Sequence, residues 1–172
     1  MVSEGVIPKL LELSLINDIG VQESCMEAIC SLLCKRELAD EILLSGGLEV
    51  IVRLCVKDCV TSETLLQPCA HALYNLSCFA KSRAEIVKNE KLVPSLNYLA
   101  TAGNLETKRF VAIVLKNLAC YASSQRKELV SKGASLTLIE LLKTESEMVK
   151  QNSAAALYYL SADIDAAMSL VS

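Results

Sequence analysis

The chain has 172 residues, of which 52% are apolar, and it carries a formal net charge of −3. This balance gives no basic surface for nucleic acid, and the absence of tryptophan, with only two phenylalanines, removes the usual platforms for stacking bases. No apolar run of 18 residues and no apolar segment typical of a signal peptide occur, so the sequence gives no indication of membrane insertion or secretion.

Helical segments with the same apolar pattern recur along the chain. The first carries an apolar pair three residues apart, Leu10 and Leu13, and similar pairs return at Ile51 and Leu54, Leu96 and Leu99, and Leu138 and Leu141. The second members of these pairs are 41, 45 and 42 residues apart. Pro8 and Pro94 suit the first turn of such a helix, where the missing N–H has no partner to lose. A short additional helix is predicted before the last three segments, at residues 37–45, 83–89 and 125–132.

A longer helix follows each of these segments, at residues 21–34, 67–78, 107–120 and 150–161. The four copies share a small residue, a leucine-like residue and, three positions later, a leucine: Ala28-Ile29-Leu32, Ala72-Leu73-Leu76, Val114-Leu115-Leu118 and Ala156-Leu157-Leu160. Apolar groups at i, i+1 and i+4 form the buried stripe of a helix. Four copies of one helix indicate a repeat array. Asn104 is predicted to cap the third copy, and residues 144–147 are typical of a capping box before the fourth.

The second unit is irregular. Leu54 and Asn75 are 21 residues apart, whereas the matching interval is 18 in the other three units. The extra residues fall within residues 57–66, and Pro68 stands where the other copies are already helical. Because proline lacks an N–H donor and clashes with the preceding turn, this long helix is expected to start late or to bend. The long loop is a candidate specificity element, with a neutral insertion as the alternative.

The runs G-x-I-P-x-L-L-x-L at residues 5–13 and A-L-x-N-L at residues 72–76 resemble the armadillo repeat, a unit of about 42 residues with one short and two longer helices. The resemblance implies an all-α, right-handed α-α superhelix formed by a single array over residues 1–172. Repeats are expected at residues 3–35, 36–81, 82–123 and 124–161, with residues 162–172 starting a further, truncated one, so that both ends look cut. HEAT repeats are the nearest alternative, which the separate short helix and the A-L-x-N-L run disfavour.

In armadillo proteins the third helices line a concave groove, where a ladder of asparagines holds the backbone of an extended peptide. The resemblance places this ladder at Asn75 and Asn117, with Ser31 and Tyr159 at the same position in the outer repeats. It therefore implies a non-enzymatic scaffold that binds an extended segment of another protein. The alternative interpretation of these residues is a polar edge of the buried stripe.

One turn before the ladder, importin-α carries tryptophans that sandwich the lysines of nuclear-localisation signals. The corresponding positions here are Glu27, His71, Ile113 and Ala155. Without tryptophan, binding of such signals is disfavoured. Positive charge on the later third helices, from Lys108, Arg109, Lys116 and Lys150, instead favours acidic partners, as in β-catenin. Self-assembly through the array ends or the outer surface is the competing hypothesis, and the oligomeric state is open.

The eight cysteines predict neither disulfides nor a metal site. Cys30 and Cys34 lie one helical turn apart, with Cβ atoms about 5–6 Å apart, against about 3.8 Å in a disulfide. Reduced thiols predict an intracellular protein, cytoplasmic with nuclear and ciliary locations left open. Cysteines of successive repeats, on helices about 8–10 Å apart, cannot share one zinc ion.

The single histidine offers no catalytic arrangement. His71 and Cys78 lie two helical turns apart, about 10 Å along the axis, too far for a base and its nucleophile. No catalytic residue and no cofactor are therefore predicted.

Overall fold

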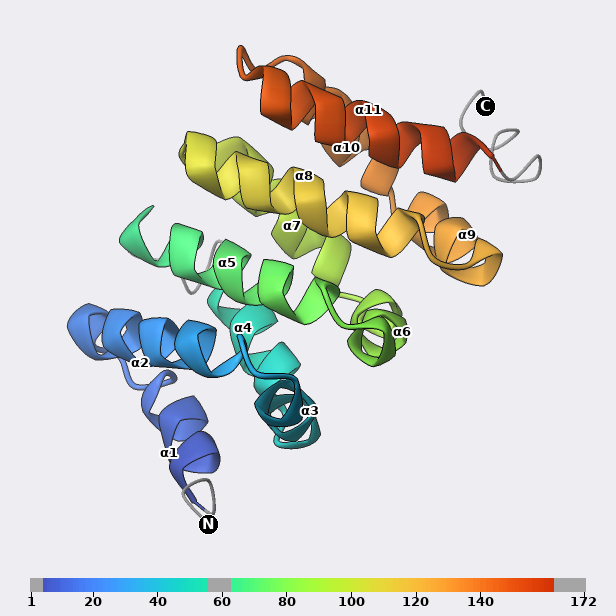
Figure 1. Ribbon diagram of the computed structural model, residues 1–172. Helices are drawn as coiled ribbons and strands as arrows, with labels where there is room; N and C mark the ends of the chain where they lie inside the picture. The colour runs from blue at the N-terminus through green and yellow to red at the C-terminus, as the bar shows by residue number, and fades with distance from the viewer. Residues whose placement is uncertain (1–4, 56–62, 163–172) are drawn as a thin grey trace.

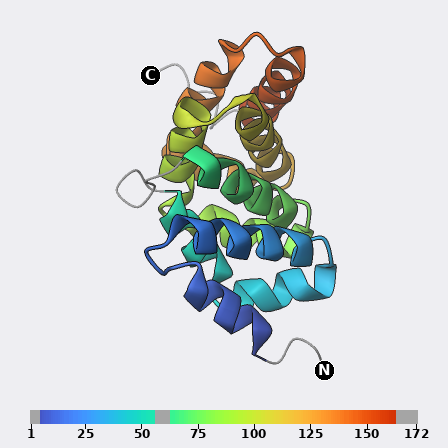
Figure 2. The same cartoon turned by 90° about the vertical axis from the view of Figure 1, so that its left-hand side faces the viewer.

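The molecule is built from two layers of helices. The computed structural model describes residues 5–55 and 63–162, and all regular structure in these ranges is helical, as predicted. One layer consists of the long third helices, which lie side by side (Figure 1): α2 (Ile19–Leu32), α5 (Leu66–Ser77), α8 (Leu105–Ala119) and α11 (Glu147–Ser161). The other layer, seen beside it in Figure 2, consists of α1 (Val6–Leu13), α4 (Gly47–Leu54), α7 (Leu92–Ala102) and α10 (Ala134–Leu142).

Three short helices lie at one end of the two layers (Figure 1): α3 (Arg36–Leu44), α6 (Ala80–Lys88) and α9 (Ser123–Ser131). They correspond to the short helices predicted before the second, third and fourth segments. Within the described ranges, no helix is both long enough and apolar enough to cross a bilayer.

The core lies between the layers and runs through all the repeats. In the two central repeats every residue of the predicted apolar stripe is buried: Ala72, Leu73, Leu76, Val114, Leu115 and Leu118. The opposite layer contributes Ile51, Leu96 and Leu138, which are also buried. Each pair of antiparallel helices therefore buries its apolar surface against the neighbouring pairs, and no pair has a separate core.

Glycine turns connect the short helices to the second layer. Gly46 and Gly133 directly precede α4 and α10, with φ of 80° and 85°. Residues with a Cβ adopt this left-handed conformation at a cost of roughly 1–2 kcal/mol, which explains the glycines. Pro8 and Pro94 lie in the first turns of α1 and α7, as predicted.

One of the two predicted N-caps is confirmed. Asn104 Oδ1 accepts a hydrogen bond from the backbone N–H of Thr107 at 2.9 Å. The capping box at residues 144–147 is wrong: Ser146 caps α11 by accepting from Val149, and Glu147 is the first helical residue. The hydroxyl of Thr144 instead donates to the carbonyl of Leu141 at 2.9 Å, so it is occupied by the preceding helix.

Helix α5 starts late, as predicted. Ser31, Asn117 and Tyr159 each lie twelve residues after the start of their helix, whereas Asn75 lies nine after Leu66. A single 3-10 turn, Glu63–Leu65, precedes the helix, and Pro68 lies in its first turn, where an N–H is not required. Residues 57–62 of the predicted loop and residues 163–172 of the predicted further repeat lie outside the described residues.

Candidate functional site

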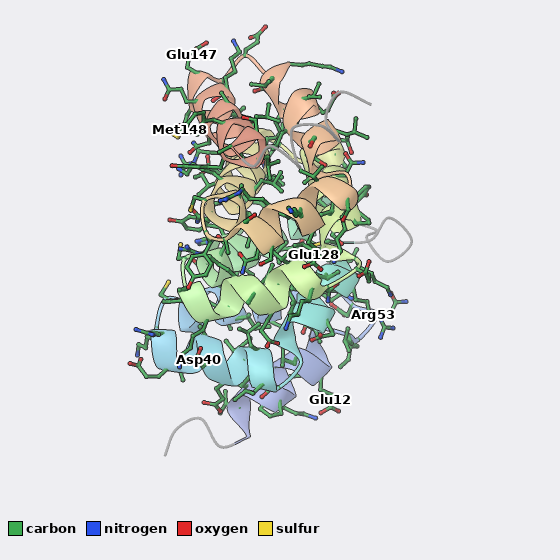
Figure 3. All side chains as sticks on the ribbon, turned by 90° about the vertical axis from the view of Figure 1, so that its right-hand side faces the viewer. Glu12, Asp40, Arg53, Glu128, Glu147 and Met148 are labelled. Carbon is green, nitrogen blue, oxygen red and sulfur yellow. The ribbon has the colours of Figure 1, made fainter. Side chains whose placement is uncertain are left out.

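The third-helix layer has one surface that faces away from the second layer, and this surface is here called the third-helix face. Figure 3 looks onto α3, α6 and α9, and places Met148 of α11 on one side of the molecule and Arg53 of α4 on the other. Of the predicted site residues, Glu27 and Ser31 are exposed, Asn75 is buried, and the others are half-buried: His71, Ile113, Lys116, Asn117 and Tyr159.

A cleft of about 420 Å³ opens between α2 and α5. It brings together three of the predicted residues, Glu27, Ser31 and His71. Four residues that the sequence analysis did not assign to the site complete its lining: Cys30, Cys34, Gln67 and Pro68. The cleft therefore combines an acidic and a polar rim with sulfur, proline and imidazole walls.

A cluster of rings joins α5 to α8. The imidazole of His71 stacks on the ring of Phe110, with centroids 4.7 Å apart and planes inclined by 13°. Tyr74 lies against both rings, at 6.1 Å from His71 and 5.4 Å from Phe110. Burial lowers the pKa of His71, an effect that the nearby carboxylate of Glu106 opposes. The imidazole is therefore favoured in its neutral form, as a flat stacking surface.

The ladder asparagines form hydrogen bonds between neighbouring repeats. Asn75 Nδ2 donates to the carbonyl of Cys30 on α2 at 3.2 Å. Asn117 Nδ2 donates to the hydroxyl of Ser77 on α5 at 3.0 Å, and that hydroxyl donates to the carbonyl of Tyr74 at 2.7 Å. Each amide thus commits one of its two N–H groups to holding adjacent third helices together.

The positive charges of the later third helices are largely engaged by neighbours. Arg109 pairs with Glu106 at 3.1 Å, Lys150 with Glu147 at 3.1 Å, and Lys116 Nζ donates to Asn152 Oδ1 at 2.6 Å. Lys108 lines a recess with residues of α7 and α10, on the side of the second layer. The two ion pairs offset the charges of Arg109 and Lys150, whereas Lys116 keeps its charge because the side chain of Asn152 is neutral.

Sequence comparison identifies one of the repeats directly. The profile of the Armadillo/beta-catenin-like repeat matches residues 123–162, which contain α9, α10 and α11. This part of the chain is an armadillo repeat. No curated protein sequence matches the chain.

Solved structures show that the whole chain has the armadillo fold, a right-handed superhelix of stacked helices. The crystal structure of an engineered protein is 25% identical, with a TM-score of 0.86 over 99% of this chain and 41% of that protein. A designed armadillo repeat protein is 22% identical, with a TM-score of 0.79 over 92% of this chain. A second one, solved in complex with the peptide (KR)4, is 20% identical, with a TM-score of 0.76. This chain spans 66% of the length of each designed protein.

The described cysteines divide into a buried and an exposed group. Cys25, Cys30, Cys55 and Cys69 are buried, whereas Cys34, Cys78 and Cys120 are exposed at the ends of α2, α5 and α8. All seven are free, Cys59 lies outside the described residues, and no cluster of metal ligands occurs among the residues described.

Two of the cleft residues that sequence reasoning missed, Cys30 and Pro68, belong to repeat columns. Cys30 stands one residue before the ladder position of its helix, as Tyr74 and Lys116 do on theirs. Pro68, Phe110 and Asn152 each stand seven residues before it on the next helix. Aligning the four third helices gives both columns, but only contacts between different helices show that the two columns meet.

Proposed function

We propose that this armadillo array is a non-enzymatic scaffold that binds an extended segment of another protein along the third-helix face. The observation that supports this most strongly is the α2/α5 cleft, which opens among predicted site residues of two adjacent repeats. The designed armadillo protein with a bound peptide supports the same use of the fold. We propose Glu27, Ser31, His71, Asn75, Ile113, Lys116, Asn117 and Tyr159 as the binding residues.

An extended segment suits the spacing of this face. Packed helices lie about 8–10 Å apart, and an extended chain rises about 3.3 Å per residue. Each repeat can therefore meet two or three residues of the partner. Because alternate side chains of an extended chain point in opposite directions, one of them can enter a cleft between helices while its neighbour faces solvent. The free cysteines support the predicted intracellular setting for such an interaction.

The test is selection of binders from a display library of random peptides, followed by titration of the selected peptides against two variants. Ser31→Arg places a long charged side chain at the mouth of the cleft and is expected to weaken binding by roughly tenfold or more. Thr101→Arg is the matched control. Thr101 is an exposed hydroxyl residue in the second layer whose side chain donates to the carbonyl four residues back, as that of Ser31 does.

Equal affinities for the two variants would place the binding site elsewhere on the molecule. A library that yields no binder to the wild-type chain would contradict the proposed function itself. Both variants should keep the wild-type circular dichroism spectrum, since both substituted side chains are exposed.

A second candidate function is self-association through the last hairpin. Large apolar side chains are exposed there: Leu136 is 72%, Met148 50% and Tyr158 69% accessible. Where such side chains form one contiguous patch, they mark an association site. Light scattering against concentration tests the candidate: Leu136→Lys should lower the apparent mass if this surface self-associates, and a wild-type monomer at high concentration would exclude it.

A further inference from the structure

The three junctions between neighbouring third helices can be compared position by position. At each junction, two residues of the earlier helix face one residue of the later helix. The two residues of the earlier helix stand four and one positions before the ladder position of that helix. The residue of the later helix stands seven positions before the ladder position of its own helix. The three sets are Glu27, Cys30 and Pro68; His71, Tyr74 and Phe110; and Ile113, Lys116 and Asn152. The same three positions therefore determine how each junction is filled.

The middle junction is filled by rings. Phe110 of α8 enters between the helices, stacks on His71 at 4.7 Å and lies 5.4 Å from Tyr74. Its ring is almost completely removed from solvent, at 9% exposure. The last junction is filled by a polar pair, because Lys116 Nζ donates to Asn152 Oδ1 at 2.6 Å. Both junctions thus close with side chains of the chain itself.

At its three compared positions the first junction has neither a ring nor such a polar pair. Cys30 stands where Tyr74 stands in the middle junction, and Pro68 stands where Phe110 stands. The thiol of Cys30 is directed across the junction, donating to the carbonyl of Pro68 at 3.2 Å. The residues at all three positions of this junction, Glu27, Cys30 and Pro68, line the open cleft of about 420 Å³.

We propose that the α2/α5 cleft receives an aromatic side chain of the bound segment, tryptophan or tyrosine, in the position that Phe110 takes at the next junction. This inference rests on the proposed function and names the residue type that the segment must carry. His71 borders the cleft from α5 while it stacks on Phe110 from α8, so an entering ring extends an existing stack. The sulfur atoms of Cys30 and Cys34 line the same space and suit contact with a ring edge.

The rim of the cleft selects rings that carry a hydrogen-bond donor. Glu27 is exposed beside the cleft, and its ionised carboxylate can only accept hydrogen bonds. An indole N–H or a phenol O–H supplies the missing donor, whereas phenylalanine does not. A lysine side chain would also satisfy Glu27 and could lay its aliphatic stem along the walls, but it has no ring to stack on the imidazole of His71, so it serves as the competing probe.

The direct test uses small probes and the signal of the single histidine. N-acetyl-tryptophanamide is titrated while the Hε1 proton of His71 is followed by NMR, beside N-acetyl-lysinamide and N-acetyl-leucinamide. The tryptophan probe should shift the signal and saturate at millimolar concentration, binding roughly tenfold or more tightly than either competitor. Equal shifts with the lysine or leucine probe would overturn the inference.

Two variants test whether the tryptophan probe binds in the α2/α5 cleft. Cys30→Tyr with Pro68→Phe transfers the rings of the middle junction to the first and should reduce binding of the tryptophan probe by roughly tenfold or more. Asn152→Phe adds a ring at the matching position of the last junction and should leave that binding unchanged. Undiminished binding to the double variant, with its helical circular dichroism intact, would overturn the inference.

Peptides selected from the display library separate this inference from the proposed function. Replacing their aromatic residue with alanine should weaken binding by roughly tenfold or more. Selected peptides that bind the third-helix face without any aromatic residue would overturn the inference and leave the proposed function standing.

Discussion

At the scale of single residues, Asn75 has two possible roles that the sequence alone does not separate: binding a partner and joining neighbouring repeats. The ladder position predicts an amide that faces a partner, and the side chain is nevertheless only 8% exposed because its Nδ2 donates across the repeat boundary to Cys30. Asn117, bonded to Ser77, is half-buried. The two amides therefore stabilise the stack whether or not a partner is bound.

Asn75→Ala should lower the free energy of unfolding by about 0.5–1.5 kcal/mol, because it removes the amide donor from the carbonyl of Cys30, which then keeps only the weak hydrogen bond from the thiol of Cys34. Asn97→Ala, at an exposed position of α7, is the control and should change it by no more than about 0.5 kcal/mol. Urea denaturation measures both. Equal stabilities for the two variants would show that the Asn75 bond contributes nothing to folding.

The thiols should differ in reactivity according to burial. Burial, followed by the effects of Cys69, Cys34 and Glu27, raises the pKa of Cys30 to about 12. At pH 8 its thiolate fraction is therefore far below that of an ordinary cysteine, and the thiolate is the nucleophile. Iodoacetamide should modify Cys34, Cys78 and Cys120 well before Cys30, as peptide mapping by mass spectrometry would measure. Modification of Cys30 at the same rate would contradict its burial.

At the scale of elements, helix starts test how far local sequence determines structure. The late start of α5 was predictable, because Pro68 and the extra residues both lie next to the helix start in the sequence. The N-cap of α11 was not, because Thr144 and Ser146 are both suitable caps and the choice depends on Leu141, whose carbonyl accepts the Thr144 hydroxyl. Which of the two hydroxyl groups caps α11 is therefore determined by the end of α10, which lies outside the capping-box sequence.

Gly133→Ala should destabilise the chain by about 1–2 kcal/mol, since φ is 85° at this turn. An added Cβ there meets nothing within 4 Å, so the cost is conformational and not steric. Gly20→Ala is the matched control: Gly20 lies in the first turn of α2, and alanine should stabilise that helix by about 0.5–1 kcal/mol. Thermal melting compares the two, and a shift of the same sign in both would contradict the assigned backbone conformations.

At the scale of the whole molecule, the fold was predictable and the cleft was not. Four copies of one apolar stripe, as in Ala72, Leu73 and Leu76, determine both helix and stacking, since only a repeated layer buries them all. The cleft depends on Cys30 and Pro68, which are 38 residues apart and come together only across a repeat boundary. Lys116 and Asn152 meet in the same way, which is why the hydrogen bond between their side chains could not be predicted from sequence.

Lys132 provides a test of how local stability is in this array. It is 11% exposed, and its ammonium group contacts the carbonyl of Val87 at 2.7 Å, Glu128 at 2.9 Å and Glu90 at 3.3 Å. Lys132→Met should lower the free energy of unfolding by about 1–3 kcal/mol. In a stacked array this loss should increase hydrogen exchange in α9, α10 and α11 far more than in α2.

The control for Lys132 is Lys143→Met. Lys143 pairs with Glu140 at 2.6 Å, but its side chain is 68% exposed, so its loss should change stability by no more than about 0.5 kcal/mol. A uniform increase in hydrogen exchange over the whole chain after Lys132→Met would show that the array unfolds as one cooperative unit.

The side-chain bonds between third helices also set a mechanical property. Asn75 to Cys30, Asn117 to Ser77 and Lys116 to Asn152 lie one after another along the layer and cross every boundary between its four helices. Straightening or tightening the superhelix would stretch or compress each of these distances, so the three bonds resist a change in the spacing of the third helices. A bound segment would have to match that fixed spacing, and a single residue inserted between two of its anchor points would shift every later contact.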